Sequence, residues 1–116
     1  MLDNRISLTQ GLYQQKQLDK QTWQVTFSDQ SHAIFKAHFK FMPLLPAFLQ
    51  IDIAAELAGL KIIAIKQAKY IKPIKPNDQV EYSLVEEKTD HWLLKITDNT
   101  TTLSLIKIIA TKKNEP

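Results

Sequence analysis

An almost wholly apolar segment between Pro46 and Gly59 constrains the fold of this chain more than any other feature of its sequence. Pro46 suits the first turn of a helix, where its missing N–H costs nothing, and Gly59 supplies a stop signal. Residues 47–58 continue between them without a helix breaker. Because apolar side chains occupy nearly every face of this helix, we expect other elements to enclose it. It is predicted to be the central helix of the domain.

Strand patterns flank this helix on both sides. Residues 23–28 alternate apolar and polar side chains, which predicts a strand with one buried face. Residues 11–18 are expected to form its hairpin partner, although both of their faces are mostly polar. Four further antiparallel strands are predicted after Gly59, at residues 61–71, 79–87, 91–98 and 101–111. Turn residues separate the last four strands at Asp78, Lys88–Asp90 and Asp98–Thr100.

This order of elements predicts one α+β domain over residues 1–116, with a helix packed on one face of an antiparallel sheet. A chain of 116 residues is close to the commonest domain size. The sequence contains no internal repeat, low-complexity segment or linker. Residues 112–116 are expected to form a frayed tail.

Composition narrows the classes of function. Hydrophobic residues make up 44% and charged residues 23% of the chain, so neither a disordered nor a fibrous protein is expected. The absence of cysteine excludes disulfides and thiolate chemistry. No secretory signal is visible, which predicts a cytoplasmic protein, and no apolar run approaches the roughly 20 residues that span a bilayer. The net charge of +3 comes from scattered lysines, so nucleic-acid binding is not expected.

Two polar residues, His38 and Asp52, are candidates for a functional site: His38 precedes the apolar helix segment, and Asp52 lies within it. His38 precedes a turn that contains Pro43 and Pro46, and Asp52 lies within the helix that follows. An isolated buried carboxylate is costly, so Asp52 needs either a partner or a proton. Together the two side chains offer a base and an acid next to an apolar wall, which favours a catalytic site.

The segment from His38 to Asp52 resembles the active-site motif of the beta-hydroxyacyl-ACP dehydratases of fatty-acid synthesis (the FabA/FabZ type; ACP is acyl carrier protein). That motif reads His-Phe-x-Gly-x-Pro-x-x-Pro-Gly, followed by a helix with Asp or Glu. The matching residues, at the family's spacing, are His38, Phe39, Pro43, Pro46 and Asp52. Residues 69–80 resemble a second family segment, Lys/Arg-Phe-x-x-Pro-Val-x-Pro-Gly-Asp-x-Leu. The resemblance extends from about residue 10 to residue 111 and implies the hotdog fold, in which an antiparallel sheet wraps around one helix.

The sequence departs from the first motif at three glycines. Ala37 replaces the glycine before the histidine, Phe41 the glycine three residues after it, and Ala47 the glycine after the second proline. A non-glycine residue would be strained at any of these positions that requires a positive φ. Ala47 is the safest substitution because a helix N-terminus has an ordinary φ, whereas Phe41 affects the turn and the acyl entrance. Glu56 is a fourth departure, because the family usually has Gln there.

The resemblance implies dehydration of a 3-hydroxyacyl thioester bound to acyl carrier protein, with no metal or organic cofactor. Neutral His38 would take the α-proton, protonated Asp52 would assist departure of the hydroxyl group, and the Ala47 N–H would hold the thioester oxygen. In the family, the histidine and the acid of one pocket come from different subunits, which implies a homodimer with a continuous sheet. Burial and a nearby Glu56 carboxylate are expected to raise the pKa of Asp52 and to support it as an acid. Residues expected to line the acyl pocket are Phe39, Phe41, Pro43, Phe48 and Leu49. For the three phenylalanines and Leu49, packing in the core is the default alternative, although some of them must line the pocket of an enzyme.

Each assignment has a plainer alternative. The alternative for His38 is a hydrogen-bonded histidine packed in a turn, and for Asp52 a helix acid satisfied by a lysine or a backbone donor. For Glu56, a hydrogen-bonded network or the helix surface is favoured over a catalytic part. His32 and His91 have no partners at ligand spacing, so we assign them neither a role nor a metal site. Five lysines are expected to be solvated, or alternatively to form a landing patch for acyl carrier protein: Lys61, Lys66, Lys69, Lys72 and Lys75.

Two rival functions stay open on sequence grounds. A hotdog thioesterase would use a carboxylate to direct water at the thioester carbonyl, and the presence of His38 argues against it. A non-catalytic hotdog subunit would bind acyl chains or partner a complete enzyme. The three missing glycines are the best support for this second rival.

Overall fold

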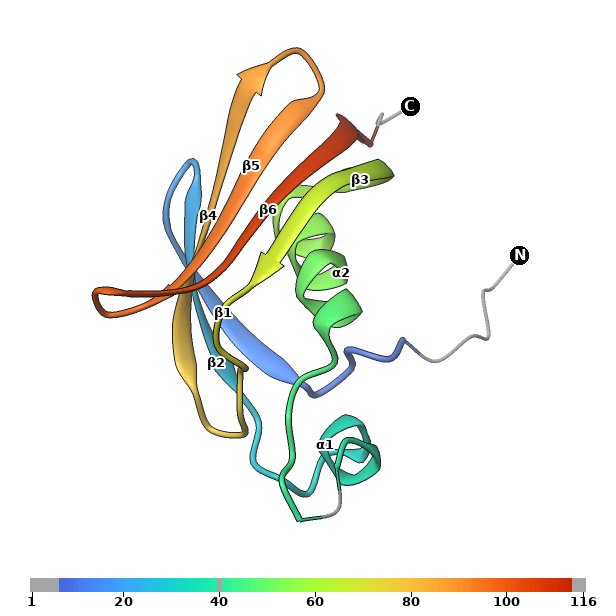
Figure 1. Cartoon of the computed structure of the whole chain (residues 1–116), viewed down its shortest axis with the longest axis vertical. Helices are drawn as coiled ribbons and strands as arrows, with labels where there is room; N and C mark the ends of the chain where they lie inside the picture. Colours follow the sequence, from blue (N-terminus) through green and yellow to red (C-terminus); the bar gives the residue numbers. More distant parts are fainter. Residues whose placement is uncertain (1–6, 40, 114–116) are drawn as a thin grey trace.

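The computed structural model describes residues 7–39 and 41–113, which form a six-stranded antiparallel sheet and two helices (Figure 1). In chain order, the elements are β1 (Tyr13–Asp19), β2 (Thr22–Phe27), α1 (Ala33–Ala37), α2 (Ala47–Ala58), β3 (Leu60–Tyr70), β4 (Gln79–Lys88), β5 (His91–Asp98) and β6 (Thr101–Lys112). The strand order in the sheet is β1-β2-β4-β5-β6-β3, so β1 and β3 are the two edge strands. Helix α2 lies against one face of the sheet, which confirms the predicted α+β class.

The predicted helix and strands agree closely with those observed. Helix α2 has the predicted bounds, with Pro46 as its N-cap and Gly59 as a left-handed C-cap at φ 65°. The predicted turns contain Asp90 and Asn99 at φ 64° and 53°, and short polar side chains tolerate this left-handed region. Each strand begins and ends within two residues of its predicted position, because both the period-two pattern and the turn residues mark it.

Helix α1 was not predicted. Of its five residues, Phe35 is the one that is buried, so the segment carries no helical periodicity that a sequence could reveal. Its N-cap is His32, which is not among the residue types that usually cap helices. Short helices that depend on tertiary packing leave little trace in the sequence.

The core lies between α2 and the inner face of the sheet. Strand β2 alternates buried and partly exposed residues as predicted, and β5 does the same over most of its length. A row of paired residues crosses the inner face from β3 to β2, and side chains directly opposite one another share a face. In order, this row is Tyr70, Ser104, Ile96, Tyr82 and Trp23.

One face of α2 is not enclosed, contrary to our expectation from its sequence. Phe48, Asp52 and Glu56 follow one another at four-residue spacing, which places them on the same side of the helix. All three are exposed, and Phe48 is 56% exposed despite its apolar ring. The described part of this chain therefore buries the sheet-facing side of α2 and leaves the side with Phe48, Asp52 and Glu56 exposed.

The C-terminal residues are paired further than the predicted tail allows. Lys112 closes β6 opposite Leu60, and the N–H of Lys113 donates to the carbonyl of Gly59 at 2.9 Å. The rest of the predicted tail, residues 114–116, lies outside the described residues. Within the described ranges, neither helix is long and apolar enough to cross a bilayer.

Candidate active site

His38 is positioned by the short helix α1, whose C-cap it forms. At the other end of α1, Nδ1 of His32 accepts the N–H of Ile34 at 3.0 Å. Nε2 of the same ring therefore carries the proton, and it donates to the carbonyl of Gln10 at 2.8 Å. His32, which had no assigned role on sequence grounds, is thus a structural residue that caps the helix before His38.

The two motif segments recognised in the sequence lie side by side. The N–H of Leu45 donates to the carbonyl of Ile74 at 2.8 Å, which joins the proline-containing turn to the segment after β3. Within that turn, Phe39 and Met42 exchange backbone hydrogen bonds of 3.2 Å, and the N–H of Leu44 donates to the carbonyl of His38. These bonds fix His38 relative to the start of α2.

The N-terminus of α2 presents backbone donors for which the described residues provide no acceptor. No side chain of the described residues caps this end, and Pro46 has no N–H of its own. The N–H of Leu49 is taken by the carbonyl of Pro46 at 3.0 Å. The N–H groups of Ala47 and Phe48 therefore remain for a ligand, at the end of the helix that carries partial positive charge.

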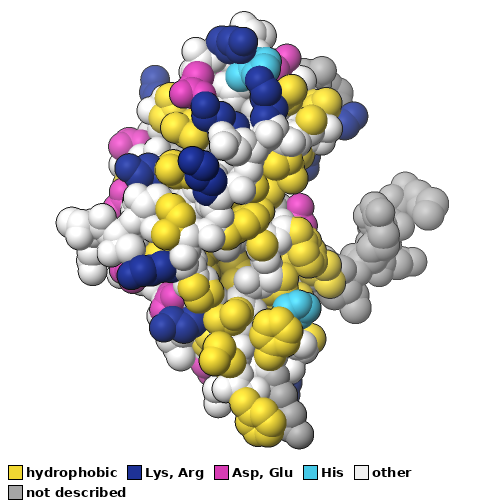
Figure 2. Space-filling model, viewed as in Figure 1, with side chains coloured by type: hydrophobic (Ala, Val, Ile, Leu, Met, Phe, Trp, Pro, Cys, Tyr) yellow, Lys and Arg dark blue, Asp and Glu magenta, His cyan; other side chains and the backbone are white. Residues whose placement is uncertain are grey.

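A cavity of about 550 Å³ brings these features together. It is lined by His38 and Phe39, by residues 44–48, by Gln50 and by residues 70–73 at the end of β3. Figure 2 shows a band of hydrophobic side chains that runs along β3 and α2 toward the α1 end of the molecule. The cavity combines an imidazole, free backbone N–H groups and apolar walls, which suits a ligand with an acyl chain and a polar head.

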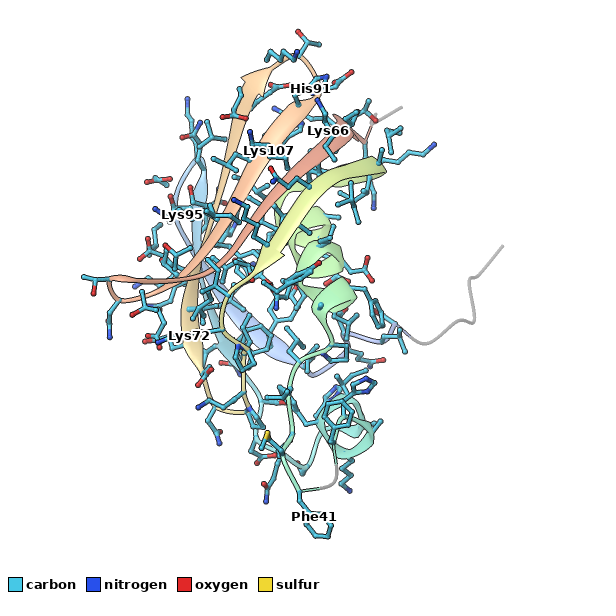
Figure 3. The ribbon with its side chains drawn as sticks, viewed as in Figure 1. Phe41, Lys66, Lys72, His91, Lys95 and Lys107 are labelled. Carbon is cyan, nitrogen blue, oxygen red and sulfur yellow. The ribbon has the colours of Figure 1, made fainter. Side chains whose placement is uncertain are left out.

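Five residues predicted from sequence to line an acyl pocket fall into two groups. Phe39 and Phe48 line the cavity with His38. Phe41 is 91% exposed and projects from the tip of its turn (Figure 3), and Leu49 is fully buried in the core. Pro43 lines a different cavity with Phe35. A linear motif does not reveal which way each side chain points, and this is why three of the five lie elsewhere.

The missing glycines do not strain the backbone. Among the described non-glycine residues, positive φ occurs at Asn77, Asp90 and Asn99. Ala37, Phe41 and Ala47 are not among these, so their side chains meet no penalty of this kind. Asn77 stands where the second family motif has its glycine, and its φ of 69° is one that Asn tolerates better than most residues. The substituted glycine positions of the first motif therefore need no left-handed backbone in this chain.

Asp52 does not line the cavity that contains His38; it lies on the exposed side of α2. Partial desolvation and the neighbouring Glu56 carboxylate both raise the pKa of Asp52, as the sequence predicted. Glu56 itself accepts hydrogen bonds from Thr9 Oγ1 at 2.6 Å and from the hydroxyl of Tyr13 at 2.7 Å. This agrees with our preferred interpretation of Glu56 as a member of a network. Burial and the bond to Glu56 raise the pKa of Tyr13.

Several cavity residues, including Gln50 and Tyr70, were not named as site residues on sequence grounds. Tyr70 and Lys72 belong to the second motif segment. The signal for their place in the site was this motif, but the sequence does not show that it lies beside the first motif. Gln50 is a buried amide within an otherwise apolar stretch of α2, and this break in the pattern was its signal.

Comparison with known protein families assigns this chain to one of them. A family profile described as ApeI dehydratase matches residues 13–105. The chain belongs to the ApeI-like dehydratase family. A comparison with curated proteins finds no match to this chain. The family match supports the dehydratase class that the sequence predicts, but not the fatty-acid-synthesis type specifically.

Solved structures support the fold of this ApeI-like chain. A chain of the dehydratase heterocomplex ApeI:P from Xenorhabdus doucetiae is 22% identical, with a TM-score of 0.69 over 85% of this chain and 95% of that chain. An uncharacterized protein from Erwinia carotovora subsp. atroseptica is 27% identical, with a TM-score of 0.55 over 87% and 92%. A mutant thioesterase from Pseudomonas aeruginosa is 11% identical, with a TM-score of 0.60 over 90% and 84%. These likenesses confirm the predicted hotdog fold, which dehydratases and thioesterases share.

Proposed function

We propose that this protein removes water from a 3-hydroxyacyl thioester, carried by acyl carrier protein, to give the trans-2-enoyl thioester. The observation that carries this proposal is the cavity in which His38 meets the free N–H groups at the start of α2. Membership of a dehydratase family supports the reaction class. A cytoplasmic location, as expected from the sequence, is part of the same proposal.

Removal of the α-proton is assigned to His38. Neutral imidazole takes the proton from C2, and the carbonyl oxygen gains negative charge as the C2–H electron pair moves toward it. The N–H of Ala47 donates to that oxygen, and the positive end of α2 stabilises the charge. The electron pair then forms the C2–C3 double bond as the C3–O bond breaks. The departing hydroxyl group needs a proton in order to leave as water.

We assign that proton to Asp52 of a second subunit. Within one chain, Asp52 lies outside the cavity that contains His38, on the open side of α2. Strand β3 is a long edge strand beside this helix and exposes Ile63 and Ile65. Pairing of two β3 edges would cover these side chains and bring the partner's α2 close to the cavity. The raised pKa of Asp52 favours the protonated form that an acid catalyst requires.

The second subunit is proposed to be another copy of this chain. A solved relative is described as a heterocomplex of two proteins, so a different hotdog chain is the other candidate for the partner. The molecular mass of the purified protein by light scattering distinguishes a homodimer from a monomer that awaits a different partner. A monomer that catalyses dehydration at full rate would contradict the shared site.

The carrier protein is proposed to dock near the lysines that surround the cavity mouth. Lys72 lines the cavity, and Lys69 and Lys75 are exposed on either side of it in the sequence. Lys66 lies further along β3 (Figure 3). An acidic carrier would be attracted to these charges, and this attraction would weaken with added salt.

The rival functions are weaker than they were on sequence grounds. A non-catalytic subunit was supported mainly by the three missing glycines, and none of those positions has a positive φ. A thioesterase shares the fold, but His38 in the cavity offers a base suited to the α-proton. A non-catalytic subunit needs neither the imidazole nor the helix N-terminus in the cavity, and a thioesterase needs the N–H donors but not the imidazole.

One assay tests the proposal against both rivals. Purified protein is incubated with 3-hydroxyacyl and with saturated acyl thioesters of acyl carrier protein, and both enoyl product and free thiol are followed. We expect enoyl product from the first substrate, and loss of a general base in His38→Ala should slow its formation by about 10²- to 10⁴-fold. His91→Ala, far from the cavity on β5, is the matched control. Thiol release from the saturated substrate without any enoyl product would instead identify a thioesterase.

A further inference from the structure

Gln50 is a buried polar residue in the wall of the cavity. Its side chain is 2% exposed, and its Oε1 accepts a hydrogen bond of 2.6 Å from Oγ of Ser104. Ser104 is itself fully buried in the row that crosses the inner face of the sheet, between Tyr70 and Ile96. A buried amide in such an apolar layer is costly unless it is bonded, so one half of the Gln50 side chain is satisfied by β6.

The other half of this amide faces the cavity. The bond to Ser104 uses Oε1, so Gln50 has the two N–H groups on Nε2 left to donate. Among the described residues, the buried side-chain nitrogen or oxygen without a hydrogen-bond partner is the Tyr82 hydroxyl. Nε2 of Gln50 is therefore not sealed in the core, and it reaches the cavity that Gln50 lines with His38. The bond to Ser104 also limits rotation of the amide.

The position of Gln50 relates it to the thioester head of a ligand. Gln50 lies three residues after Ala47, which corresponds to about 4.5 Å along the helix axis. If the N–H of Ala47 holds the thioester carbonyl oxygen, a side-chain donor one turn further along the same helix and in the same cavity wall is suited to a substituent two carbon atoms further along the acyl chain. In a 3-hydroxyacyl group, that substituent is the hydroxyl oxygen.

We propose that Gln50, oriented by Ser104, is a specificity-determining residue that donates a hydrogen bond to the C3 oxygen of the bound acyl group. This inference rests on the proposed function for the choice of ligand. It goes beyond that function because it gives the cavity a means to distinguish a hydroxylated chain from a saturated one. A site built to hydrogen-bond an oxygen disfavours the analogue that lacks it, because its own donor is then left unpaired.

Equilibrium binding tests the inference without any turnover. The probes are two pantetheine amides of equal chain length, one 3-hydroxyacyl and one saturated, in which the amide replaces the reactive thioester. Affinities are measured by calorimetry for the wild type, for Gln50→Met, which keeps the side-chain length but has no N–H, and for Ser104→Ala. Gln15→Met on the exposed edge strand β1 is the matched control.

We expect the wild type and the Gln15 variant to bind the hydroxylated probe about 3- to 10-fold more tightly than the saturated one, the effect of one neutral hydrogen bond. Gln50→Met should bind both probes equally, and should bind the saturated probe at least as tightly as the wild type does, because it has no donor to leave unpaired. Ser104→Ala should lose part of the preference because the amide is no longer held. A preference unchanged in Gln50→Met, even with a lower melting temperature, would overturn the inference, as would no preference in the wild type. If the preference is present but no enoyl product forms with the natural thioester, the proposed reaction fails while the Gln50 contact stands.

Discussion

Mixed dimers of two inactive variants give the sharpest test of the shared site. His38 lines the cavity, whereas Asp52 of the same chain lies outside it on the open side of α2. In a symmetric dimer, each pocket would then take its base from one subunit and its acid from the other. His38→Ala and Asp52→Asn should each inactivate both pockets of their own homodimer. A mixed dimer of the two variants should recover one complete pocket, because its wild-type histidine and wild-type aspartate face each other.

The expected magnitude follows from counting pockets. The mixed dimer, isolated through different tags on its two subunits, should show about half of the wild-type kcat per dimer, since one of its two pockets is intact. An unsorted equal mixture should show about a quarter, because half of its dimers are mixed. The parent variants should each lie about 10²- to 10⁴-fold below the wild type, the usual effect of losing a general acid or base. Formation of enoyl thioester is the measured quantity.

A second mixed dimer carries the same substitutions in the other arrangement. It joins a wild-type subunit to a subunit with both His38→Ala and Asp52→Asn. If the pocket is shared, each of its pockets lacks one catalytic residue, and we expect no activity. If the pocket lies within one chain, this dimer retains about half of the activity and the first dimer retains none, since only the arrangement differs. That reversed result would refute our reasoning about the subunit interface.

Three further predictions concern stability and assembly. Because the pKa of Asp52 is raised in the folded protein, folding is favoured below the unfolded pKa of about 3.9 and loses this contribution as pH rises through the folded pKa. Asp52→Asn should therefore raise the melting temperature at pH 7, and a gain that persisted unchanged below about pH 4 would contradict the assignment. Tyr82→Phe removes a buried hydroxyl that has no partner among the described residues. The free energy of unfolding in urea should therefore stay level or rise by about 1 kcal/mol. A decrease of that size would mean that the hydroxyl is hydrogen-bonded in the assembled protein. Ile65→Lys on the β3 edge should shift sedimentation toward monomer and abolish activity, whereas Leu18→Lys on the β1 edge should do neither.

The fold was predictable because several local signals agreed with one another. Pro46 and Gly59 mark both ends of α2, and the period-two pattern of the strands is interrupted at polar turns. Helix α1 escaped prediction because its one buried residue, Phe35, creates no pattern. Its cap depends on a hydrogen bond from His32 to a carbonyl far away in the sequence, that of Gln10. Interactions of this kind become visible only when the chain is folded.

The candidate site was predictable in part, since a motif gives residue types and spacing but not direction. It identified His38 and Ala47, which share the cavity, and it also named Leu49, which faces the core instead. Residues next to each other on a helix point about 100° apart, so Phe48 and Leu49 cannot both face one cavity easily. Gln50 was passed over because a polar residue that interrupts an apolar run is read as a break in the pattern. Its bond to Ser104 depends on strand register, which the sequence does not provide.

The expectation that α2 is enclosed on all sides is not met by the described residues of one chain, and this bears directly on the proposed mechanism. Its apolar faces indicated a helix enclosed on all sides, yet Phe48 is exposed on the side that also carries Asp52. Strand β3, which contacts α2, adds the exposed Ile63 and Ile65 to the same part of the molecule. Exposed apolar side chains gathered beside a free strand edge cost free energy in water, and a second subunit would remove that cost. The surface that lacks its cover is thus the surface that carries the acid missing from the cavity, so a single dimer contact would complete both the hydrophobic core and the catalytic pair.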